Sequence, residues 1–479
     1  MITSLDSAVI DANCEAMGVR VSHLMANAGR AVASVLSERF PDKRIAFVCG
    51  NGNNGGDGIS AAGLMGEPEK ITVYLVRPKE SIRSEYIQHV LSDLKCEVKD
   101  FSNFDPDLHD VLVDCVLGTG ASGEVKPPYD EVITTINKFK GAVVSVDVPS
   151  GLGTKLSVNP RVTIALHDIK ELMNEKNSGE IIIKDIGIPM EAQEGIGPGD
   201  MLRYPIPSKN SHKGSNGRLL IIGGGPYYGA PAMSALAAMR VGVDIVRLAV
   251  PEKCAPLIAS FSPVLMITGL SGDILRTEHL DRLLELTRMY DAVLIGPGLG
   301  TSAETAETVR QFAKKCELPM VIDADGLTAL GKDFKSNGKT VLTPHSREFE
   351  GLGGNALSVI EPTKLLADAT NSIILFKGRT DWVSDGKRLR YNTAGTPGMT
   401  TAGTGDVLAG IVAGLLSKGM NCFDAAALGA FISGRAGEHA FNERSYGMIA
   451  TDVIEAIPRV LKEHLRDHCR ETIDEGDFC

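Results

Sequence analysis

The chain has 479 residues, of which 43% are hydrophobic and 23% charged, values that are typical of globular protein and exclude disordered and collagen-like architectures. At roughly 100–200 residues per domain this length allows two to four domains, and we expect two. The 52 glycines and the aromatic content of 5% favour an α/β enzyme over a protein that stacks aromatic side chains on nucleic-acid bases. The net charge of -11 excludes binding dominated by nucleic-acid phosphates.

Cysteine usage and hydropathy indicate a cytoplasmic protein. The nine cysteines are dispersed without a C-x-x-C pair, which argues against a zinc site and against a secreted disulfide framework. Residues 1–20 include Asp6, Asp11 and Glu15 and lack the apolar core of a signal peptide. The longest uncharged run, residues 219–239, is interrupted at residues 223–226 by three glycines and a proline, so we expect no membrane span.

In the first 200 residues, short apolar runs alternate with Gly-rich turns and amphipathic helical patterns. Strands that alternate with helices predict a parallel sheet covered on both faces, with ligands at the carboxyl ends of the strands. The predicted strands are residues 45–49, 71–76, 111–116 and 143–148, and the predicted helices include residues 22–39 and 84–94.

A segment rich in helix and strand breakers separates this pattern from a second one. Residues 187–208 contain glycines or prolines at positions 187, 189, 195, 197, 198, 199, 205 and 207. We therefore predict one domain over residues 1–207 and another over residues 208–479, with a charged helix end at residues 461–479. In the second domain we expect strands at 218–222, 245–250, 292–295, 320–322, 340–342 and 373–376, and helices at 232–241, 303–315, 407–417 and 424–440.

A polar, glycine-rich loop follows the first predicted strand. Residues 50–58 read Gly-Asn-Gly-Asn-Asn-Gly-Gly-Asp-Gly and lead into a helical pattern at residues 59–65, a geometry in which backbone N–H groups can hold an anion. Asn53, Asn54 and Asp57 present oxygens, however, and these require a cation or a ligand hydroxyl between them and a phosphate. An Asn-Gly hairpin turn is the alternative interpretation, although no strand alternation follows.

Two further predicted strands end in a carboxylate at the same edge of the sheet. Asp114 leads into Gly118-Thr119-Gly120, and Asp147 leads into Pro149-Ser150-Gly151. A single such Asp can merely cap the next turn, but three polar strand ends together favour a binding site.

These segments, 53–58, 114–120 and 147–151, resemble the NAD(P)H-hydrate epimerase family. The resemblance implies a Rossmann-like three-layer sandwich in which Asp147 is the acid–base residue and a potassium ion is held by Asn54, Asp114 and Ser150. It implies that the hydrated nucleotide is bound by Asn53, Asn54, Gly55, Gly56, Asp57, Gly118, Thr119, Gly120, Ala121, Ser122, Gly123, Glu124 and Asp147.

The sequence departs from that family at two places. Ala26 stands where the family usually carries Glu, and the segment 151–162 is short. Lys170, close to a late lysine of the family, is an additional candidate for the site.

In the second half, a glycine-rich turn precedes an apolar helical pattern. Gly403-Thr404-Gly405-Asp406 leads into residues 407–417, so N–H groups converge at the helix start and Asp406 lies in its first turn. An anion-binding turn beside a carboxylate suits phosphoryl transfer to a hydroxyl, because Asp406 can accept the hydroxyl proton. A helix-capping Asp after a flexible turn is the alternative.

Other strand ends of this half carry polar residues as well. Lys377 follows an apolar run and could serve nucleotide phosphates or lie in solvent, and a solitary His such as His345 is more often structural than catalytic. Asp323 and Asp325 could mark a metal site or a turn, and we leave them unassigned.

Residues 228–231, 296–300, 323–327, 343–345, 377–378 and 402–406, in this order, resemble the ADP/ATP-dependent NAD(P)H-hydrate dehydratases, whose fold is a ribokinase-like α/β/α sandwich. The resemblance implies that the hydrate is contacted by Ala230, Gly298, His345 and Asp406, with Asp406 as the catalytic base. It implies that the adenine nucleotide is contacted by Lys377, Gly378, Arg379, Thr380, Asp381 and Gly405.

Together, the two resemblances predict a bifunctional enzyme that repairs NADHX and NADPHX, the hydrated forms of the reduced nicotinamide cofactors. One domain would epimerise the R and S forms at C6 with K⁺, and the other would dehydrate the S form with Mg²⁺ and ADP or ATP. We expect small-molecule substrates, no nucleic acid, no membrane and a homo-oligomer. Two alternatives remain open: a ribokinase-like kinase of another small molecule, and a non-enzymatic binding role for the N-terminal domain.

Overall fold

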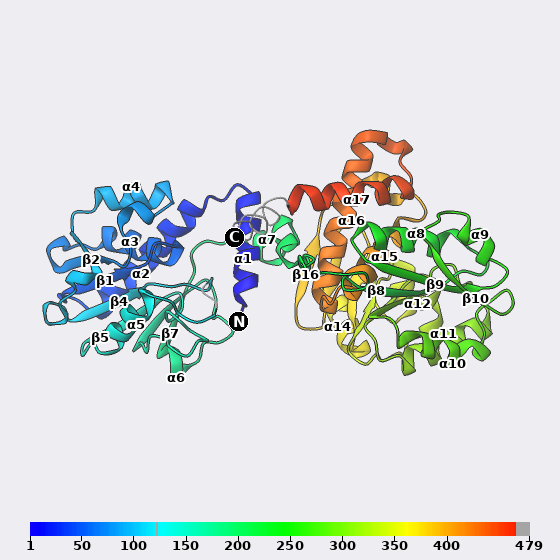
Figure 1. The fold of residues 1–479 in the computed structure, drawn as a ribbon, viewed down its shortest axis with the longest axis horizontal. Helices are drawn as coiled ribbons and strands as arrows, with labels where there is room; N and C mark the ends of the chain where they lie inside the picture. Colours follow the sequence, from blue (N-terminus) through cyan, green and yellow to red (C-terminus); the bar gives the residue numbers. More distant parts are fainter. Residues whose placement is uncertain (121–122, 466–479) are drawn as a thin grey trace. The chain divides into compact units, whose positions relative to one another are not determined.

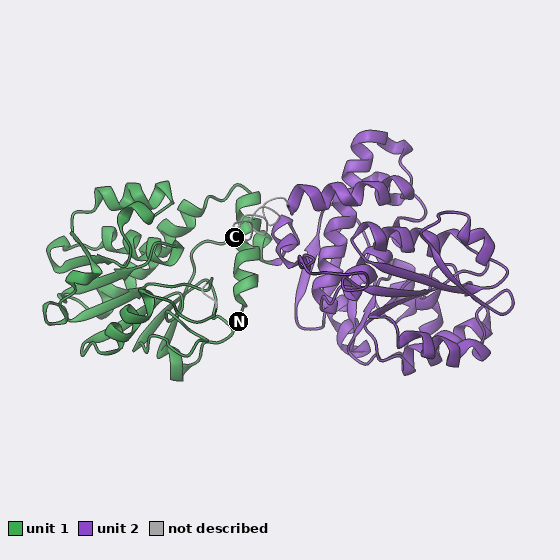
Figure 2. Ribbon diagram, viewed as in Figure 1, with its two compact units in different colours: residues 1–193 green, residues 194–479 purple. Residues whose placement is uncertain are grey.

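The computed structural model describes residues 1–120 and 123–465. The chain forms two compact units, residues 1–193 and residues 194–479 (Figure 2). None of the helices in the described ranges is long and apolar enough to cross a membrane.

The first unit is a seven-stranded parallel sheet with the strand order β3-β2-β1-β4-β5-β6-β7 (Figure 1). Because the order reverses at β1, the neighbouring β1 and β4 leave a crevice at their carboxyl ends, where open α/β sheets bind ligands. The strands are β1 (Ile45–Cys49), β2 (Ile71–Leu75), β3 (Glu97–Asp100), β4 (Val111–Cys115), β5 (Ala142–Val146), β6 (Val162–Leu166) and β7 (Glu180–Lys184). The helices are α1 (Ser4–Ala16), α2 (Val21–Arg39), α3 (Asn53–Leu64), α4 (Glu85–Asp93), α5 (Tyr129–Asn137), α6 (Glu175–Ser178) and α7 (Met190–Glu194).

Alternate side chains of each strand build the two faces of this sheet. Ile45 and Phe47 of β1 pack with helices α2 and α3 in one core, whereas Ala46 and Val48 pack with helix α5 in another. All four side chains are buried, as a parallel sheet with helices on both faces requires. The predicted three-layer sandwich is therefore confirmed, and strands β3, β6 and β7 are additions that the sequence analysis did not include.

The second unit is a nine-stranded sheet in the order β10-β9-β8-β11-β12-β13-β14-β15-β16. Its strands are β8 (Arg218–Ile222), β9 (Ile245–Pro251), β10 (Met266–Leu270), β11 (Ala292–Ile295), β12 (Met320–Ile322), β13 (Thr340–Leu342), β14 (Ile373–Phe376), β15 (Asp381–Ser384) and β16 (Leu389–Asn392). Its helices are α8 (Gly229–Arg240), α9 (Ala255–Ala259), α10 (Leu280–Thr287), α11 (Ala303–Lys315), α12 (Asp325–Leu330), α13 (Ser346–Gly351), α14 (Ile360–Thr370), α15 (Thr404–Ser417), α16 (Cys422–Arg444) and α17 (Ala450–His464). Strands β14, β15 and β16 pair antiparallel, and the other pairs are parallel.

Helices cover both faces of this second sheet as well (Figure 1). Leu219 and Ile221 of β8 pack in the core that includes helices α8, α15, α16 and α17, and Leu220 and Ile222 pack in the core that includes α10 and α11. The uncharged run at 219–239 is a strand, a turn and a helix, as the glycines and the proline predicted. Helix α17 covers the first four residues of the predicted charged helix end.

Residues 194–207, which the sequence analysis assigned to the first domain, pack in the second unit. The backbone N–H of Ile196 donates to the carbonyl oxygen of Tyr391 at 2.7 Å, and the Tyr204 hydroxyl donates to the carbonyl oxygen of Val241 at 2.9 Å. Asp200 is fully buried and forms an ion pair with Arg390. Glycines and prolines mark where regular structure stops, but they carry no information about which core the irregular chain covers, and so the division lies at 193/194 instead of 207/208.

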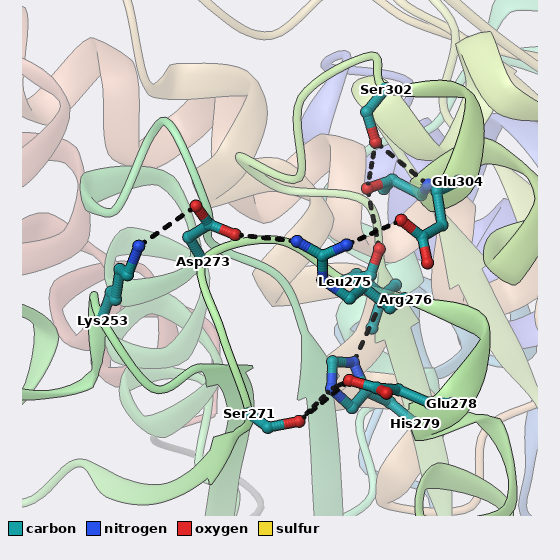
Figure 3. A network of polar contacts seen from close by, with 10 residues as sticks. Lys253, Ser271, Asp273, Leu275, Arg276, Glu278, His279, Ser302 and Glu304 are labelled. Carbon is teal, nitrogen blue, oxygen red and sulfur yellow. Dashed lines mark hydrogen bonds and ion pairs between the residues drawn. The ribbon is translucent and has the colours of Figure 1, made fainter.

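A polar network holds the connection between β10 and α10 (Figure 3). Asp273 pairs with Lys253 at 3.2 Å and with Arg276 at 3.1 Å, and Arg276 also reaches Glu304 at 2.9 Å. The buried His279 accepts a hydrogen bond from the backbone N–H of Arg276 at 3.1 Å, which fixes the turn before α10. The ion pairs lie at the surface, where each contributes little to stability.

Candidate active sites

A cavity of about 580 Å³ opens at the carboxyl edge of the first sheet. Its walls come from helices α1 and α2, the start of helix α3, and the segments that follow strands β4, β5 and β6. This is the edge at which the sequence predicted the site. Of the residues implied by the epimerase resemblance, those that line the cavity are Asn53, Asn54, Asp57, Gly118, Thr119, Gly120 and Asp147.

The glycine-rich segment after β1 is mostly helical, which corrects the predicted loop over residues 50–58. Helix α3 begins at Asn53, after Gly52 in extended conformation. Gly55 and Gly56 face the protein, since a Cβ at Gly55 would lie 1.9 Å from the carbonyl oxygen of Gly50 and one at Gly56 would lie 2.5 Å from Ile87. Gly55 therefore lets the helix approach the end of strand β1, and Gly56 lets it approach helix α4, while Asn53, Asn54 and Asp57 line the cavity.

The remaining residues of the implied epimerase set lie away from the cavity or outside the described residues. Gly123 and Glu124 are exposed and do not line the cavity, and Glu124 pairs with Lys155 at 3.6 Å. Ala121 and Ser122 belong to the part of the chain that the structure does not describe.

Asp114, Asn54 and Ser150 meet behind the cavity at the ends of β4 and β5. The fully buried Asp114 carboxylate accepts hydrogen bonds from the Ser145 hydroxyl at 2.7 Å and the Ser150 backbone N–H at 2.9 Å. Burial raises the pKa of Asp114, and these hydrogen bonds partly offset the rise. The Asn54 amide nitrogen donates to the carbonyl oxygen of Leu117 at 3.0 Å, whereas its buried Oδ1 has no hydrogen-bond partner.

This arrangement suits a cation with oxygen ligands. An unpartnered buried carbonyl oxygen is costly in a folded protein, and hard cations take carboxylate and amide oxygens as ligands. Asn54 Oδ1 and the Asp114 carboxylate are donors of this kind, and they are linked through Ser150, whose hydroxyl bonds to Asp114 and to the Leu117 carbonyl oxygen that Asn54 also contacts. The residues that the sequence analysis grouped for potassium are thus brought together by the fold.

Asp147 follows strand β5 in a left-handed backbone conformation, with φ of 64°. Such a conformation is unusual for a residue other than glycine and is often found at functional positions. Its carboxylate lines the cavity and forms an ion pair with Lys170, whose ammonium group also donates to the carbonyl oxygen of Leu166 at 2.6 Å. Lys170, only 6% exposed, is therefore held beside Asp147 by the segment after β6.

The sequence analysis missed Asp11 as a residue of this cavity. Asp11 lies on helix α1 and lines the cavity together with other residues of that helix. Asp11 is exposed, yet the protein atoms around its carboxyl group raise its pKa, and repulsion from Asp147 adds to the rise, while Lys170 opposes it. No motif surrounds Asp11, and only the docking of helix α1 brings it to the site.

In the second unit, Asp406 lies in the first turn of helix α15, as predicted. Gly403 forms the N-cap with φ of 96°, a left-handed conformation that glycine adopts without strain. Helix α8 packs against α15 at this end, and the Ser234 hydroxyl donates to the backbone carbonyl oxygen of Asp406 at 2.9 Å. Burial raises the pKa of Asp406 to about 7, and repulsion from Asp323 adds to the rise.

Lys377 lies beside this turn but is bound to acidic side chains. Its ammonium group donates to Asp323 Oδ1 at 2.7 Å and lies 3.9 Å from Glu348. A Cβ on Gly405 would lie 3.6 Å from that ammonium group. Burial alone would lower the pKa of Lys377, but Asp323 and Glu348 outweigh it, and the pKa is raised. Lys377 therefore forms a charged cluster with Asp323 and Glu348. The sequence did not predict this cluster.

His345 has a structural role in the fold. Its Nδ1 accepts a hydrogen bond from the Arg347 backbone N–H at 3.1 Å at the start of helix α13, and its own backbone N–H donates to Glu348 at 2.8 Å. The reciprocal bonds form a capping box that places Glu348 near Lys377. The side chain of His345 stays about half exposed, at 53%, and so remains accessible to a ligand.

Ala230 and Gly298 lie at neighbouring strand ends of this sheet. Ala230 is in the first turn of helix α8, and a Cβ on Gly298 would lie 1.9 Å from the carbonyl oxygen of Tyr227, immediately before that helix. Only glycine fits there, because Gly298 also has φ of 71°.

The residues implied for nucleotide binding after Lys377 form the turn between β14 and β15. Gly378 and Arg379 are exposed and Thr380 is half-buried. Asp381 faces inward instead, accepting hydrogen bonds from the Gly378 backbone N–H at 3.1 Å and from Asn392 at 3.0 Å. Asp381 thus stabilises the turn that presents the other three residues.

The two units therefore define a class: a two-domain α/β enzyme that joins a Rossmann-like cavity to a ribokinase-like fold with a carboxylate at a helix start. A family model described as YjeF-related protein N-terminus matches residues 21–172, and one described as NAD(P)H-hydrate dehydratase matches residues 219–459.

Comparisons over the whole length are more specific. The chain is 39% identical to the bifunctional NAD(P)H-hydrate repair enzyme Nnr of Methanothermobacter thermautotrophicus, over 95% of this chain and 94% of that protein. It is 40% identical to the protein of the same name from Hyperthermus butylicus, over 96% of this chain and 92% of that protein. The chain belongs to this family of bifunctional NAD(P)H-hydrate repair enzymes.

A solved structure is similar to part of the chain. The ADP/ATP-dependent NAD(P)H-hydrate dehydratase from Bacillus subtilis, co-crystallised with ATP and Mg²⁺, is 25% identical with a TM-score of 0.51. It covers 56% of this chain and 98% of its own length.

Proposed function

We propose that this chain catalyses both repair reactions of its family: epimerisation of R- and S-NAD(P)HX at C6 in the first unit, and nucleotide-dependent dehydration of S-NAD(P)HX to NAD(P)H in the second. The observation that carries the proposal is that each unit holds an acid–base carboxylate at the carboxyl edge of its sheet, Asp147 in one and Asp406 in the other. NADHX and NADPHX are the substrates, and ADP or ATP is the co-substrate.

In the epimerase site, Asp147 assists the proton transfer that accompanies epimerisation at C6. Its ion pair with Lys170 keeps the carboxylate oriented toward the cavity, and the rigid backbone after β5 fixes its position. Asn53, Asn54, Asp57 and residues 118–124 bind the nucleotide around it. The arrangement of Asn53, Asn54 and Asp57 on one helix start supports this assignment.

A potassium ion is the cation that we propose for the donor set of Asn54, Asp114 and Ser150. When bound, it supplies a positive charge that balances Asp114 and attracts the nucleotide phosphates. The unpartnered Asn54 Oδ1 supports this proposal because it is a buried oxygen without a donor. The chain's own residues hold that oxygen in place through the bond from the Asn54 amide to Leu117.

In the dehydratase site, Asp406 accepts the proton of the substrate hydroxyl as that oxygen takes the terminal phosphoryl group of the nucleotide. A base with a pKa of about 7 is half ionised at neutral pH and therefore suited to the task. The N–H groups at the start of helix α15 stabilise the transferring phosphoryl group. The ring nitrogen then expels phosphate, which is a better leaving group than hydroxide, and the C5–C6 double bond is restored.

Ala230, Gly298, His345 and Asp406 contact the hydrate in this proposal, and the nucleotide is bound by Lys377, Gly378, Arg379, Thr380, Asp381 and Gly405. Support comes from Lys377, which lies next to the Gly405 backbone. Mg²⁺ enters with the nucleotide and neutralises its phosphate charge. The carboxylates of Asp323 and Glu348, which both pair with Lys377, are candidates to receive it.

We further propose a cytoplasmic location and a homo-oligomer. Support for the homo-oligomer comes from exposed apolar side chains near the start of helix α8 and in and after helix α9, namely Tyr227, Tyr228, Leu257, Phe261 and Val264. Size-exclusion chromatography with light scattering tests the assembly.

The activity is tested with purified R and S epimers of NADHX. The S epimer with Mg²⁺ and either ATP or ADP should regenerate NADH, whereas the R epimer should do so only after epimerisation. Stable phosphorylation of another hydroxyl compound without regeneration of NADH would support the kinase alternative. Conversion of the S epimer alone would support a non-enzymatic N-terminal unit.

A further inference from the structure

Three carboxylates reach the epimerase cavity from three different elements. Asp11 comes from helix α1, Asp57 from helix α3 and Asp147 from the end of β5, and all three line the cavity. Among the described residues only Asp147 has a cationic partner, Lys170. The side chains of Asp11 and Asp57 form no hydrogen bond or ion pair within that part of the chain.

This difference in pairing distinguishes a carboxylate that can accept a proton from a carboxyl group that can donate one. A carboxylate bound to an ammonium group is favoured in its charged form and is suited to accept a proton. The half-buried Asp57 has no such partner, and burial together with repulsion from Asp147 and Asp11 raises its pKa well above the usual range. The cavity therefore places a carboxyl group without a cationic partner and a carboxylate paired with an ammonium group around one substrate.

Inversion at a carbon that carries a hydroxyl group requires both forms. The hydroxyl must leave with a proton from one face, and water must add to the other face and lose a proton there. A single carboxylate serves one face at a time, and enzymes commonly meet this need with two groups whose pKa values are pushed apart.

We propose that the Asp57 carboxyl group is the general acid of the epimerase, with Asp147 as the base and Asp11 as a positioning residue that disfavours the ionised form of Asp57. This inference rests on the epimerase activity proposed above and assigns a catalytic role to Asp57 beyond substrate binding. Asp11 lies outside residues 21–172, which the family model matches.

The proposed epimerisation consists of loss of water from C6 and addition of water to the opposite face. The Asp57 proton passes to the C6 hydroxyl oxygen, the C6–O bond breaks with its electron pair on oxygen, and the N1 lone pair forms an N1=C6 bond as water leaves. A water oxygen then bonds to the opposite face of C6, the N1=C6 pair returns to nitrogen, and Asp147 takes the released proton. Proton transfer from Asp147 to Asp57 through water in the cavity restores the starting state.

Backbone bonds fix helix α1, and with it Asp11, relative to the rest of the site. The Ile2 backbone N–H donates to the carbonyl oxygen of Ile169 at 2.9 Å, and the Glu171 N–H donates to that of Ile2 at 2.9 Å. The N-terminal ammonium group pairs with Asp168 at 3.0 Å. These bonds tie the start of the chain to the segment that carries Lys170, so Asp11 and Lys170 belong to one wall.

The charged and titratable groups around Asp57 come from helix α1, strand β4 and the segments after β5 and β6. They are Asp11 of α1, Cys115 of β4, Asp147 after β5, and His167 and Lys170 after β6. Lys170 favours the ionised form of Asp57, while Asp11 and Asp147 disfavour it. Removing the charge of Asp11 should therefore lower the pH at which Asp57 loses its proton.

The test follows the interconversion of separated R- and S-NADHX by chromatography. Nucleotide is left out, so that no dehydration takes place. Asp57→Asn should lower the epimerisation rate by about 10²–10⁴-fold with KM changed by only a few-fold. Asp57→Glu, which keeps a carboxyl group, should recover part of the rate. A wild-type rate in Asp57→Asn would overturn the proposal.

Asp11 is tested by the pH profile, which a purely structural role would not move. Asp11→Asn should shift the alkaline limb of the epimerisation rate to lower pH by about one unit. Glu15→Gln is the matched control, because Glu15 is exposed on the same helix and does not line the cavity. An unmoved alkaline limb in Asp11→Asn would refute the positioning role, whereas a wild-type chain that cannot epimerise would refute the proposed function itself.

Discussion

The two sites use the same location in their sheets but stabilise their carboxylates differently. Asp147 follows a strand in a left-handed conformation and is ion-paired with Lys170, whereas Asp406 lies on a helix start and has no ion pair with a cation among the described residues. The lysine near Asp406, Lys377, is bound to Asp323 instead. One edge of an α/β sheet can thus hold a carboxylate through a direct ion pair, or a carboxyl group of raised pKa through burial.

The units also differ in the role of their first residues. Residues 1–20 precede the region matched by the first family model, and residues 194–218 precede the region matched by the second. In the first unit, helix α1 forms a wall of the cavity. In the second, residues 194–207 pack on the core and supply the buried Asp200 to Arg390. The same kind of N-terminal extension is thus functional in one unit and structural in the other.

The largest expected effect comes from removing one carboxylate at a time. Asp406→Asn should lower dehydration of S-NADHX by about 10²–10⁴-fold and leave epimerisation unchanged, because it removes the base of one site only. Asp147→Asn should do the reverse. Both rates are measured on the same preparations, with and without ATP. Loss of both activities in either variant would contradict the independence of the sites.

Breaking the buried ion pair between Asp200 and Arg390 should lower the stability of the second unit. Arg390→Met removes the closer of the two arginines that pair with the buried Asp200 and leaves only Arg203 at 3.6 Å, so the free energy of unfolding of the second unit should fall by up to about 3–5 kcal/mol. Urea unfolding, followed through loss of dehydratase activity, measures the change.

The same division can be tested with fragments of the chain. A fragment of residues 194–479 should fold, whereas one of residues 208–479 should be much less stable, since it lacks Asp200 and Tyr204. Equal stability of the two fragments would instead support the boundary at 207/208.

The pH dependence of the dehydratase should report Asp406. Because its pKa is raised to about 7, the base is lost to protonation below that pH, and the rate should fall about tenfold per unit below pH 6. A raised carboxyl pKa also means that stability declines as the pH rises from about 4 to about 7, the range in which the unfolded chain ionises first. Asp406→Asn should therefore raise the Tm above pH 7 and remove that decline.

A smaller effect is expected from the cation at the first site. Replacing K⁺ by Li⁺ should lower epimerisation several-fold and lower the Tm of the first unit, because the buried Asn54 oxygen and Asp114 lose their partner. Dehydration of the S epimer serves as the control. Asn54→Ala should abolish the difference between the two salts, and a K⁺ dependence that survives in this variant would contradict the assignment.

The smallest effect is expected at the surface network of Figure 3. Arg276→Met removes the ion pairs with Asp273 and Glu304, which are solvent-accessible, so the free energy of unfolding should change by at most about 1 kcal/mol. Both activities should stay unchanged. A large loss of either activity would show that the turn before α10 is coupled to a site.

Much of the fold follows from local sequence. Apolar runs such as those within 45–49 and 218–222 were predicted as strands because they are typical of strands buried between two layers, and both segments are strands. Asp406 at a helix start was also predicted, since the glycine turn and the apolar helix are adjacent in sequence.

What the sequence did not determine depends on contacts between distant residues. Asp11, Lys170 and Glu348 reach the sites only through the docking of helix α1, the segment after β6 and the capping box of His345, and no local pattern records those approaches. The glycines at 55 and 56 could be assigned to a loop from composition, whereas in the structure they lie in helix α3, where Gly55 faces Gly50 and Gly56 faces Ile87.

The sequence by itself therefore determined the strands, the chemical groups at their ends and the family to which the chain belongs, because periodicity and motif spacing are local properties. Only the tertiary structure decided which carboxylate is paired, which is buried with a raised pKa and which unit holds residues 194–207. Charge pairing and burial depend on the distance between residues far apart in the chain, and only the folded structure fixes those distances.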